Sequence, residues 1–374
     1  MVDRTLERRD DEGRTALAVL GSGGAALARH LSRRRRWDPL GHDRPCRTQR
    51  RCRRRPGGHG PVGGPHPAAG AADGRRGSAT PLVPSSHHRQ ENRVTTTHFG
   101  ARLAEAMGRH GPLCVGLDPH PRLLADWGLP DDADGLRVFS GRVLDAAAGR
   151  CAAVKPQSAF FERHGAEGVR VLEEVLAGCR ERGLLSVLDV KRGDIGSTML
   201  AYAEAYLADG APLAADSVTL SPYLGYGALR PAVDLARATG RGVWVLGLTS
   251  NPEGAQVQQV GSPSVAARVV DQVAADNAGL APFGDVGLVV GATLPATPSV
   301  LGLDLSAAGA PVLAPGVGAQ GASGADVARV FAGLTDRVLV PVGRGILAAG
   351  PRPDDLVRAV TTWSGQLRRD LAPG

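Results

Sequence analysis

Apolar and polar positions follow one repeated order over most of the chain, in which a short apolar run precedes a longer amphipathic stretch. From about residue 98 to the C-terminus this order occurs eight times. Short apolar runs separated by helical stretches are typical of parallel strands that are buried on both faces. The runs predict strands at 113–118, 151–156, 184–190, 217–220, 242–248, 286–291, 311–314 and 337–342.

The stretches between these runs have the apolar period of helices. Eight strands, each followed by a helix, in about 275 residues favour a closed (β/α)8 TIM barrel over an open doubly wound sheet. A dinucleotide-binding sheet would carry Gly-x-Gly-x-x-Gly after its first strand, where this chain has D-P-H-P at 118–121. The predicted helices are 99–109, 138–148, 166–180, 197–207, 228–238, 265–278, 325–334 and 354–371, with a short helical piece near 298–303.

The first quarter of the chain departs from this pattern. Residues 33–93 combine arginine runs with Gly, Pro, His and Ala, and they have no apolar periodicity that could build a core. We therefore expect residues 1–97 to form a disordered low-complexity extension and residues 98–374 to form one catalytic barrel domain. Because regular patterning begins just after Val94, where a valine could correspond to a GUG start codon, we also hypothesise that residues 1–93 are absent from the native protein.

Charge is divided unevenly between these two parts. Residues 1–97 hold 20 arginines against 9 acidic residues, whereas residues 98–374 hold 24 basic against 28 acidic residues. The barrel region therefore has no electrostatic footprint for nucleic acid or membrane. The five cysteines and the loop histidines His120 and His164 show no metal-ligand spacing. Buried free thiols, which we expect at Cys114 and Cys151, suit a cytoplasmic protein.

Lysine occurs only twice, at Lys155 and Lys191, among 44 basic Lys and Arg side chains. An ammonium can give up its proton, whereas a guanidinium in a protein cannot. Lys191 follows the third predicted strand between Asp189 and Asp194, and strand alternation places Asp189 and Lys191 on one face. Because Asp118 and Lys155 end the first two strands, all these side chains are expected at the carboxyl end of a barrel, where such folds carry their chemistry.

Glycine-rich turns follow the last two predicted strands. They read P-G-V-G-A-Q-G at 315–321 and V-G-R-G-I at 342–346. Glycine lets backbone N–H groups approach an anion closely, and the guanidinium of Arg344 matches phosphate oxygens. These loops are the usual phosphate site of the barrel, so the sequence predicts a substrate that carries a phosphate group.

The segment D-V-K-R-G-D-I at 189–195 resembles the D-x-K-x-x-D-I signature of the orotidine 5′-phosphate decarboxylase family. Other blocks are similar, in the same order, to the bacterial (type 2) form that includes the mycobacterial enzymes. The resemblance extends from about His98 to the C-terminus and leaves out the first 93 residues. These blocks are L-D-P-H-P at 117–121, V-K-P-Q at 154–157, S-P-Y-L-G at 221–225, T-S-N-P-E-G at 249–254 and P-G-V-G at 315–318.

The resemblance implies removal of carbon dioxide from orotidine 5′-phosphate to give UMP in de novo pyrimidine synthesis, without metal or organic cofactor. It implies an alternating array of Lys155, Asp189, Lys191 and Asp194, in which Lys191 protonates the C6 carbanion and Asp189 faces the substrate carboxylate. It also implies a homodimer in which Asp194 reaches the active site of the partner, and pyrimidine contacts near 249–251. It also implies that Asp118 and Thr198 bind the ribose, with Thr198, like Asp194, supplied by the partner. For the phosphate it implies contacts from Gln320, Gly343 and Arg344.

Three alternative interpretations remain open from the residues. Mg²⁺-dependent sugar-phosphate decarboxylases and hexulose-phosphate synthases of the same barrel superfamily share an Asp-x-Lys pattern. A Schiff-base aldolase needs a lysine of lowered pKa, which the carboxylates beside Lys191 oppose. An RNA-binding protein acting through its arginine-rich arm is the third, although nucleic-acid binding is not expected because no aromatic residues lie among the arginines.

Overall fold

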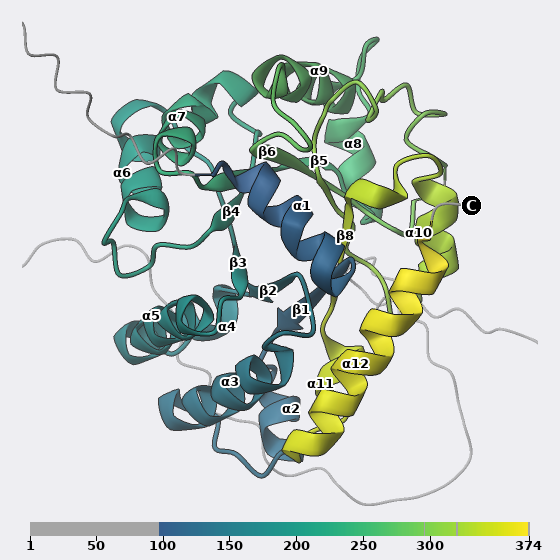
Figure 1. Ribbon diagram of the computed structural model, residues 1–374. Helices are drawn as coiled ribbons and strands as arrows, with labels where there is room; N and C mark the ends of the chain where they lie inside the picture. The colour runs from purple at the N-terminus through teal and green to yellow at the C-terminus, as the bar shows by residue number, and fades with distance from the viewer. Residues whose placement is uncertain (1–96, 295, 319–320, 373–374) are drawn as a thin grey trace, which may run out of the picture. The chain divides into compact units, whose positions relative to one another are not determined.

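The eight predicted strands form one closed parallel barrel in the computed structural model, which describes residues 97–294, 296–318 and 321–372. Each strand pairs with the next one in the chain, and β8 closes the barrel on β1. Figure 1 shows the barrel surrounded by helices. The strands are β1 (Leu113–Leu117), β2 (Ala153–Pro156), β3 (Leu185–Arg192), β4 (Ser217–Leu220), β5 (Gly242–Leu248), β6 (Val286–Val290), β7 (Val312–Leu313) and β8 (Val338–Val342).

Helices cover the outside of the barrel, and the (β/α)8 fold class is confirmed. The long helices match the predicted ones, apart from early starts such as that of α3, where Asp132 accepts a hydrogen bond from the Gly135 N–H as N-cap. The α-helices are α1 (Phe99–His110), α2 (Pro121–Asp126), α3 (Ala133–Ala147), α4 (Ala159–Glu162), α5 (Gly165–Glu181), α6 (Gly196–Leu207), α7 (Arg230–Ala238), α8 (Ala255–Gln258), α9 (Val265–Asn277), α10 (Gly324–Val330), α11 (Arg344–Leu347) and α12 (Pro353–Asp370). Three 3₁₀ helices are η1 (Tyr226–Leu229), η2 (Pro252–Gly254) and η3 (Thr335–Arg337).

The predicted helical piece near 298–303 is wrong. The Leu303 N–H donates to the Pro298 carbonyl at 2.9 Å, which closes a single turn. Gly302 takes a φ of 75°, and a left-handed residue at this place ends a helical turn. Within the described residues, therefore, β6 is not followed by a helix before β7, and the expectation that every strand is followed by one fails there.

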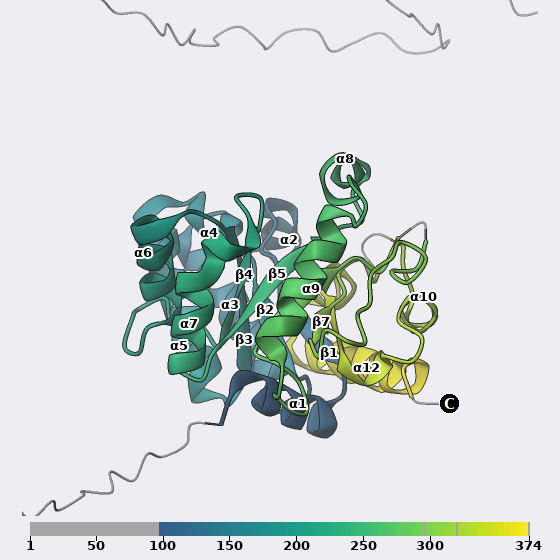
Figure 2. The ribbon, with the colours of Figure 1, turned by 90° about the horizontal axis from the view of Figure 1, so that it is seen from above.

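Helix α1 closes the end of the barrel at which the strands begin. Its first residue, Phe99, is fully buried and meets the Trp244 ring edge to face at a centroid distance of 6.0 Å. Gly242 starts β5, and a Cβ there would lie 2.1 Å from the Phe99 ring, so only glycine leaves room for it. Burial of such a ring contributes about 1.5–3 kcal/mol. Figure 2 shows α1 on one side of the molecule and α8 on the opposite side. A ligand can therefore enter at the end where the strands finish, which α1 does not cover.

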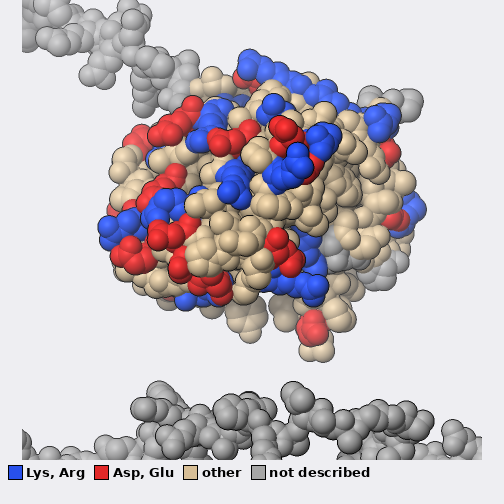
Figure 3. Space-filling model, turned by 90° about the horizontal axis from the view of Figure 1, so that it is seen from below, with Lys and Arg blue, Asp and Glu red and all other residues tan. Residues whose placement is uncertain are grey.

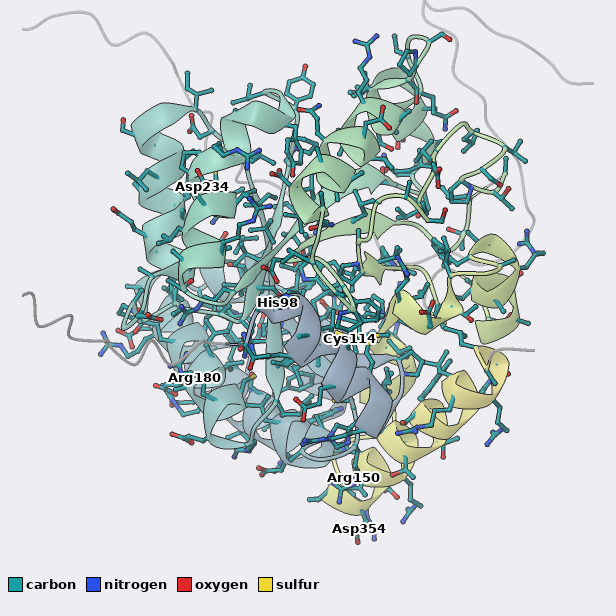
Figure 4. The ribbon with its side chains drawn as sticks, turned by 45° about the horizontal axis from the view of Figure 1, so that its top comes forward. His98, Cys114, Arg150, Arg180, Asp234 and Asp354 are labelled. Carbon is teal, nitrogen blue, oxygen red and sulfur yellow. The ribbon has the colours of Figure 1, made fainter. Side chains whose placement is uncertain are left out.

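The thiol groups of the described residues are free and buried at Cys114, Cys151 and Cys179, which confirms the expectation for the first two. Burial raises the pKa of Cys151 and of Cys179 to about 12, so both stay as thiols. In Figure 4 Cys114 lies towards the middle of the barrel, whereas Arg180 lies at its periphery.

The outer surface carries interspersed charges of both signs on the face that Figure 3 shows. On the helices, Arg137 Nε lies 2.7 Å from Glu174 Oε2, and Arg182 Nη2 lies 2.8 Å from Asp145 Oδ1. Such exposed pairs contribute little stability. None of the helices in the described ranges is long and apolar enough to cross a membrane. Residues 1–96 lie outside the described residues, so the predicted disordered extension and its boundary stay predictions.

Candidate active site

Side chains from the carboxyl ends of β1, β2 and β3 meet at the barrel mouth. Asp118 follows β1, Lys155 lies near the end of β2, and Asp189 and Lys191 lie near the end of β3. Lys155 Nζ lies 3.1 Å from Asp189 Oδ2 and 3.9 Å from Asp118 Oδ1. Lys191 Nζ lies 2.6 Å from Asp189 Oδ1. The structure therefore brings these four predicted residues into one connected set of charges.

Asp189 is the centre of this set. Its side chain is 9% exposed, and it accepts hydrogen bonds from Lys155, from Lys191 and, at 2.8 Å, from Thr219 Oγ1. Burial alone would raise the pKa of this carboxyl group, but the two ammonium groups and the hydroxyl donor outweigh burial and hold the pKa well below its ordinary value. Asp189 is therefore a carboxylate that these donors hold in place.

Lys155 is the buried cation of the set, with 10% of its side chain exposed. Burial would lower the pKa of the ammonium group, but Asp118 and Asp189 outweigh burial and raise the pKa above its ordinary value. This electrostatic environment is the opposite of the one that a Schiff-base lysine needs. Lys155 therefore serves as a permanent positive charge between two carboxylates.

Lys191 differs from Lys155 in exposure and backbone conformation. Its side chain is 46% exposed, and its φ of 44° makes it the only non-glycine residue with positive φ among the described residues. A non-glycine residue in this region carries about 1–3 kcal/mol of strain, and such strain clusters at functional sites. The backbone N–H groups of Val190 and Lys191 both donate to Thr219 Oγ1, at 3.0 and 2.9 Å.

The two pKa shifts predict how stability depends on pH. A carboxyl group with a depressed pKa stabilises the folded state above its ordinary value of 3.8, and that contribution is lost as the pH falls towards the folded value. An ammonium group with a raised pKa stabilises the folded state below its ordinary value of 10.5, and that contribution is lost only as the pH rises through the folded value. Asp189 and Lys155 should therefore both stay ionised over the range between.

We accordingly expect the difference in unfolding free energy between the wild-type protein and Asp189→Asn to be constant from about pH 5 to pH 9. Below about pH 4 the difference should shift in favour of the variant, since only the wild-type protein loses the contribution of an ionised Asp189. Urea denaturation at a series of pH values measures this. A difference that changes between pH 5 and 9 but not below pH 4 would contradict the assigned direction.

Two neighbouring cavities open beside the array. One, of about 310 Å³, is lined by Asp118 and Lys155 together with Gly316, Gly343 and Arg344. The other, of about 260 Å³, is lined by Lys155, Asp189 and Lys191 together with Thr219 and residues 249–251. Both cavities share Lys155, Pro315 and Pro341. An elongated ligand could thus place one end among the glycine-rich turns and the other against the charged array.

The glycine-rich turns have the backbone that their glycines allow. Gly316 has a φ of 127°, a conformation that other residues rarely adopt. A Cβ on Gly343 would lie 2.7 Å from Asp118 Oδ2, so the backbone and this carboxylate approach closely. Arg344 begins α11 and lines the larger cavity. Gln320 lies outside the described residues, so its predicted phosphate contact stays a prediction.

The loop after β5 is held above the smaller cavity by one glutamine. The Thr249 N–H donates to Gln258 Oε1 at 2.8 Å, and Gln258 Nε2 donates to Thr249 Oγ1 at 2.8 Å. Thr249 Oγ1 also donates to Asn251 Oδ1 at 2.6 Å. The segment predicted to contact the pyrimidine is therefore a loop at the barrel mouth that hydrogen bonds to Gln258 of α8 hold in place.

Two predicted site residues do not join the array within this chain. Asp194 Oδ1 accepts from the Ile195 N–H at 2.8 Å, and no ion pair with either lysine is found for it in the described part of the chain. Thr198 lies exposed in the first turn of α6. The chain alone therefore supplies three members of the predicted four-residue array.

Sequence reasoning missed three residues at the site. Thr219 near the end of β4 bonds Asp189, and with its amide nitrogen turned towards Asp189, Gln157 donates to Oδ2 at 3.0 Å and to the main-chain oxygen at 2.8 Å. His120 lines the larger cavity. Their position could have indicated them, because all three lie near or just beyond the end of a strand at the carboxyl edge of the barrel. Among the described residues, no group of three His, Cys, Asp or Glu side chains could hold a metal ion.

Comparison with known proteins adds independent findings. The model of the Orotidine 5′-phosphate decarboxylase / HUMPS family matches residues 111–359. A protein of Salinispora arenicola called orotidine 5′-phosphate decarboxylase is 57% identical over 256 residues, which cover 68% of this chain and 91% of that protein. One of the same name from Streptomyces coelicolor is 54% identical over 273 residues, which cover 72% of this chain and 97% of that protein.

Solved structures agree with these matches. A crystal structure of a Streptomyces avermitilis protein assigned as an orotidine 5′-phosphate decarboxylase superposes with a TM-score of 0.71 at 52% sequence identity. The match covers 74% of this chain and 97% of the Streptomyces avermitilis chain. The structure of Leishmania donovani OMP decarboxylase superposes with a TM-score of 0.60 at 30% identity, covering 74% of this chain and 100% of that one.

Proposed function

The chain belongs to the Orotidine 5′-phosphate decarboxylase / HUMPS family, and we propose that its lysine–aspartate array carries out the decarboxylation. The reaction converts orotidine 5′-phosphate to UMP and carbon dioxide in pyrimidine biosynthesis. The observation that carries the proposal for the array is the unbroken chain of contacts from Lys155 through Asp189 to Lys191, at 3.1 and 2.6 Å, beside a cavity.

The chemical step breaks the bond between C6 of the pyrimidine and its carboxyl group. The electron pair stays on C6, carbon dioxide leaves, and the ammonium group of Lys191 delivers a proton to C6. Lys191 is then neutral, and because it is 46% exposed it can take a proton back from water. A charge array that is fixed before the reaction stabilises developing charge without reorganisation.

Asp189 acts on the ground state in this proposal. Its carboxylate is ionised and 9% exposed, so a substrate carboxylate bound beside it meets a like charge in a site with little water. Departure of carbon dioxide removes that repulsion. Binding energy from the distant phosphate and ribose, held by Asp118, Gly343, Arg344 and Gln320, offsets the repulsion.

Arg344→Ala tests the phosphate end of the site. A hydrogen bond to a charged group contributes about 1.5–3 kcal/mol, so kcat/KM for orotidine 5′-phosphate should fall about 10–100-fold. Steady-state kinetics measures it. The matched control is Arg122→Ala, since Arg122 is 93% exposed on α2, and this variant should keep wild-type kinetics. Equal kcat/KM for both variants would remove Arg344 from the phosphate site.

The active enzyme is proposed to be a homodimer with shared sites. Asp194 bonds only its neighbour Ile195 among the contacts found in the described residues, and apolar side chains are exposed at the start of α6 and on the loop after β4. Ile195 is 62% exposed and Tyr223 78% exposed, and Leu200 and Leu224 are also exposed. Exposed apolar groups of this kind favour a protein–protein interface. Across it, Asp194 and Thr198 would complete the active site of the partner.

Subunit complementation tests the shared site. Lys191→Ala and Asp194→Ala should each be nearly inactive alone. A heterodimer purified through two different tags should regain about half of the wild-type activity, because one of its two sites carries both substitutions and the other carries neither. Should Asp194 serve its own chain, both sites of the heterodimer would be defective and no activity would return.

The decarboxylase function is tested by the loss of orotidine 5′-phosphate absorbance with the purified protein in EDTA. Sustained turnover is expected, whereas a Mg²⁺-dependent sugar-phosphate enzyme would show none.

The matched relatives align over nearly their whole length with about 70% of this chain, which supports residues 98–374 as the catalytic domain. The unpaired buried thiols support a cytoplasmic location.

A further inference from the structure

Thr219 makes hydrogen bonds both to the backbone of Lys191 and to the carboxylate of Asp189. It lies on β4 and is 1% exposed. In the proposed mechanism it takes no part in bond breaking or proton transfer. We propose that Thr219 is a positioning residue for decarboxylation, which holds the Lys191 backbone and the Asp189 carboxylate in their reactive arrangement through one hydroxyl group. This inference rests on the roles proposed above for Lys191 and Asp189.

The strand pairing shows why a side chain is needed there. Leu188 pairs with Val218, but the next paired residues are Arg192 and Leu220, so the β3 segment between them is longer than the β4 segment by two residues. Such a bulge leaves backbone groups without ladder partners and re-aims a side chain. The bulged segment contains Lys191 with its φ of 44°. The irregularity of β3 is thus what directs this lysine.

The hydroxyl group of Thr219 replaces the missing ladder acceptors. Its oxygen accepts from the backbone N–H groups of Val190 at 3.0 Å and of Lys191 at 2.9 Å, and it donates to Asp189 Oδ1 at 2.8 Å. A hydroxyl group has one proton to donate and two lone pairs, so every bonding position is used. The strained backbone and the carboxylate are therefore tied to the same atom.

The donor bond also fixes how the carboxylate is rotated. Oδ1 of Asp189 accepts from both Thr219 and Lys191, and Oδ2 accepts from Lys155 and Gln157. Loss of the hydroxyl group would remove one of the two donors to Oδ1, and it would leave the N–H groups of Val190 and Lys191 without this acceptor. Both changes displace Lys191 Nζ from its place beside Asp189.

The test compares Thr219→Val, which keeps the shape and removes the hydroxyl group, with Thr219→Ser, which keeps the hydroxyl group. We expect Thr219→Val to lower kcat about 100-fold, as a displacement of about 1 Å does at a reacting centre. Thr219→Ser should stay within about 5-fold of wild type. The dissociation constant of UMP, measured by calorimetry, should change little in either variant, because the phosphate and ribose contacts lie elsewhere.

The matched control is Ser217→Ala, two residues earlier on the same strand. Ser217 is also buried, donates to the Ser186 carbonyl at 3.2 Å and accepts from Trp244 Nε1 at 2.9 Å. Ser217→Ala should lower Tm, because it removes buried hydrogen bonds, but it should leave kcat unchanged. If Thr219→Val does not fold, Thr219→Cys takes its place, since a thiol is a weak donor and acceptor.

Three results would overturn the inference. They are wild-type kcat in Thr219→Val or Thr219→Cys, an equal loss of kcat in Thr219→Ser, and an equal loss of kcat in Ser217→Ala. Lys191→Ala is assayed in the same series to separate the two proposals. An inactive Lys191→Ala beside a fully active Thr219→Val refutes the positioning role alone, whereas an active Lys191→Ala refutes the proposed mechanism itself.

Discussion

Lys191→Ala is expected to lower kcat for decarboxylation of orotidine 5′-phosphate by about 10⁴-fold, while the protein stays folded and still binds UMP. The variant loses the proton donor and one of the two ammonium groups that pair with Asp189. General acid catalysis alone is worth about 10²–10⁴-fold, and the loss of electrostatic stabilisation adds to it. Because the Lys191 side chain is 46% exposed, little packing is lost. The loss of substrate absorbance measures kcat, and calorimetry measures UMP binding.

Lys191→Arg separates the proton from the charge. A guanidinium keeps the positive charge beside Asp189 but cannot give up a proton in a protein. We therefore expect Lys191→Arg to be nearly as inactive as Lys191→Ala. Substantial activity in the arginine variant would mean that charge alone accounts for the role of this residue, and another group would have to protonate C6.

Asp189→Asn is the second substitution with a large expected effect. It should lower kcat about 10²–10³-fold, as the removal of one preorganised electrostatic group does. KM should fall rather than rise, because the amide no longer repels the substrate carboxylate in the ground state. Steady-state kinetics over a full range of substrate concentration gives both constants.

The control for this substitution is Asp145→Asn, which makes the same chemical change at a side chain that is 68% exposed and paired with Arg182 on the outer surface. It should leave kcat and KM unchanged. If Asp189→Asn instead raised KM at unchanged kcat, Asp189 would act only in uniform binding, and its proposed effect on the substrate carboxylate would be wrong.

The strands and most helices could be predicted from the sequence because burial decides them. Near-continuous apolar runs such as 242–248 became strands of the barrel, and the helix predicted at 166–180 became α5. The exception between β6 and β7 has a local cause, since Gly302 ends the turn that starts at Pro298 before a helix can form. Short helices such as α2 and α11 were missed because one or two turns carry no clear period.

The predicted site residues fall into two groups. Alternation along β3 explains why Asp189 and Lys191 meet, although the positive φ of Lys191 shows that a bulge contributes as well. Strand register cannot be read from one sequence, and for that reason Thr219 was missed. Asp194 and Thr198 depend on a second chain in the proposed dimer, so the family resemblance, and not the strand pattern of this chain, predicted their place at the site.

The most direct test of the account is a crystal structure of the protein with UMP bound. We expect Lys191 Nζ to lie within about 3.5 Å of pyrimidine C6, with Asp189 on the side where the carboxyl group has left. A structure in which Lys191 Nζ points away from the ring, with a different donor next to C6, would contradict it.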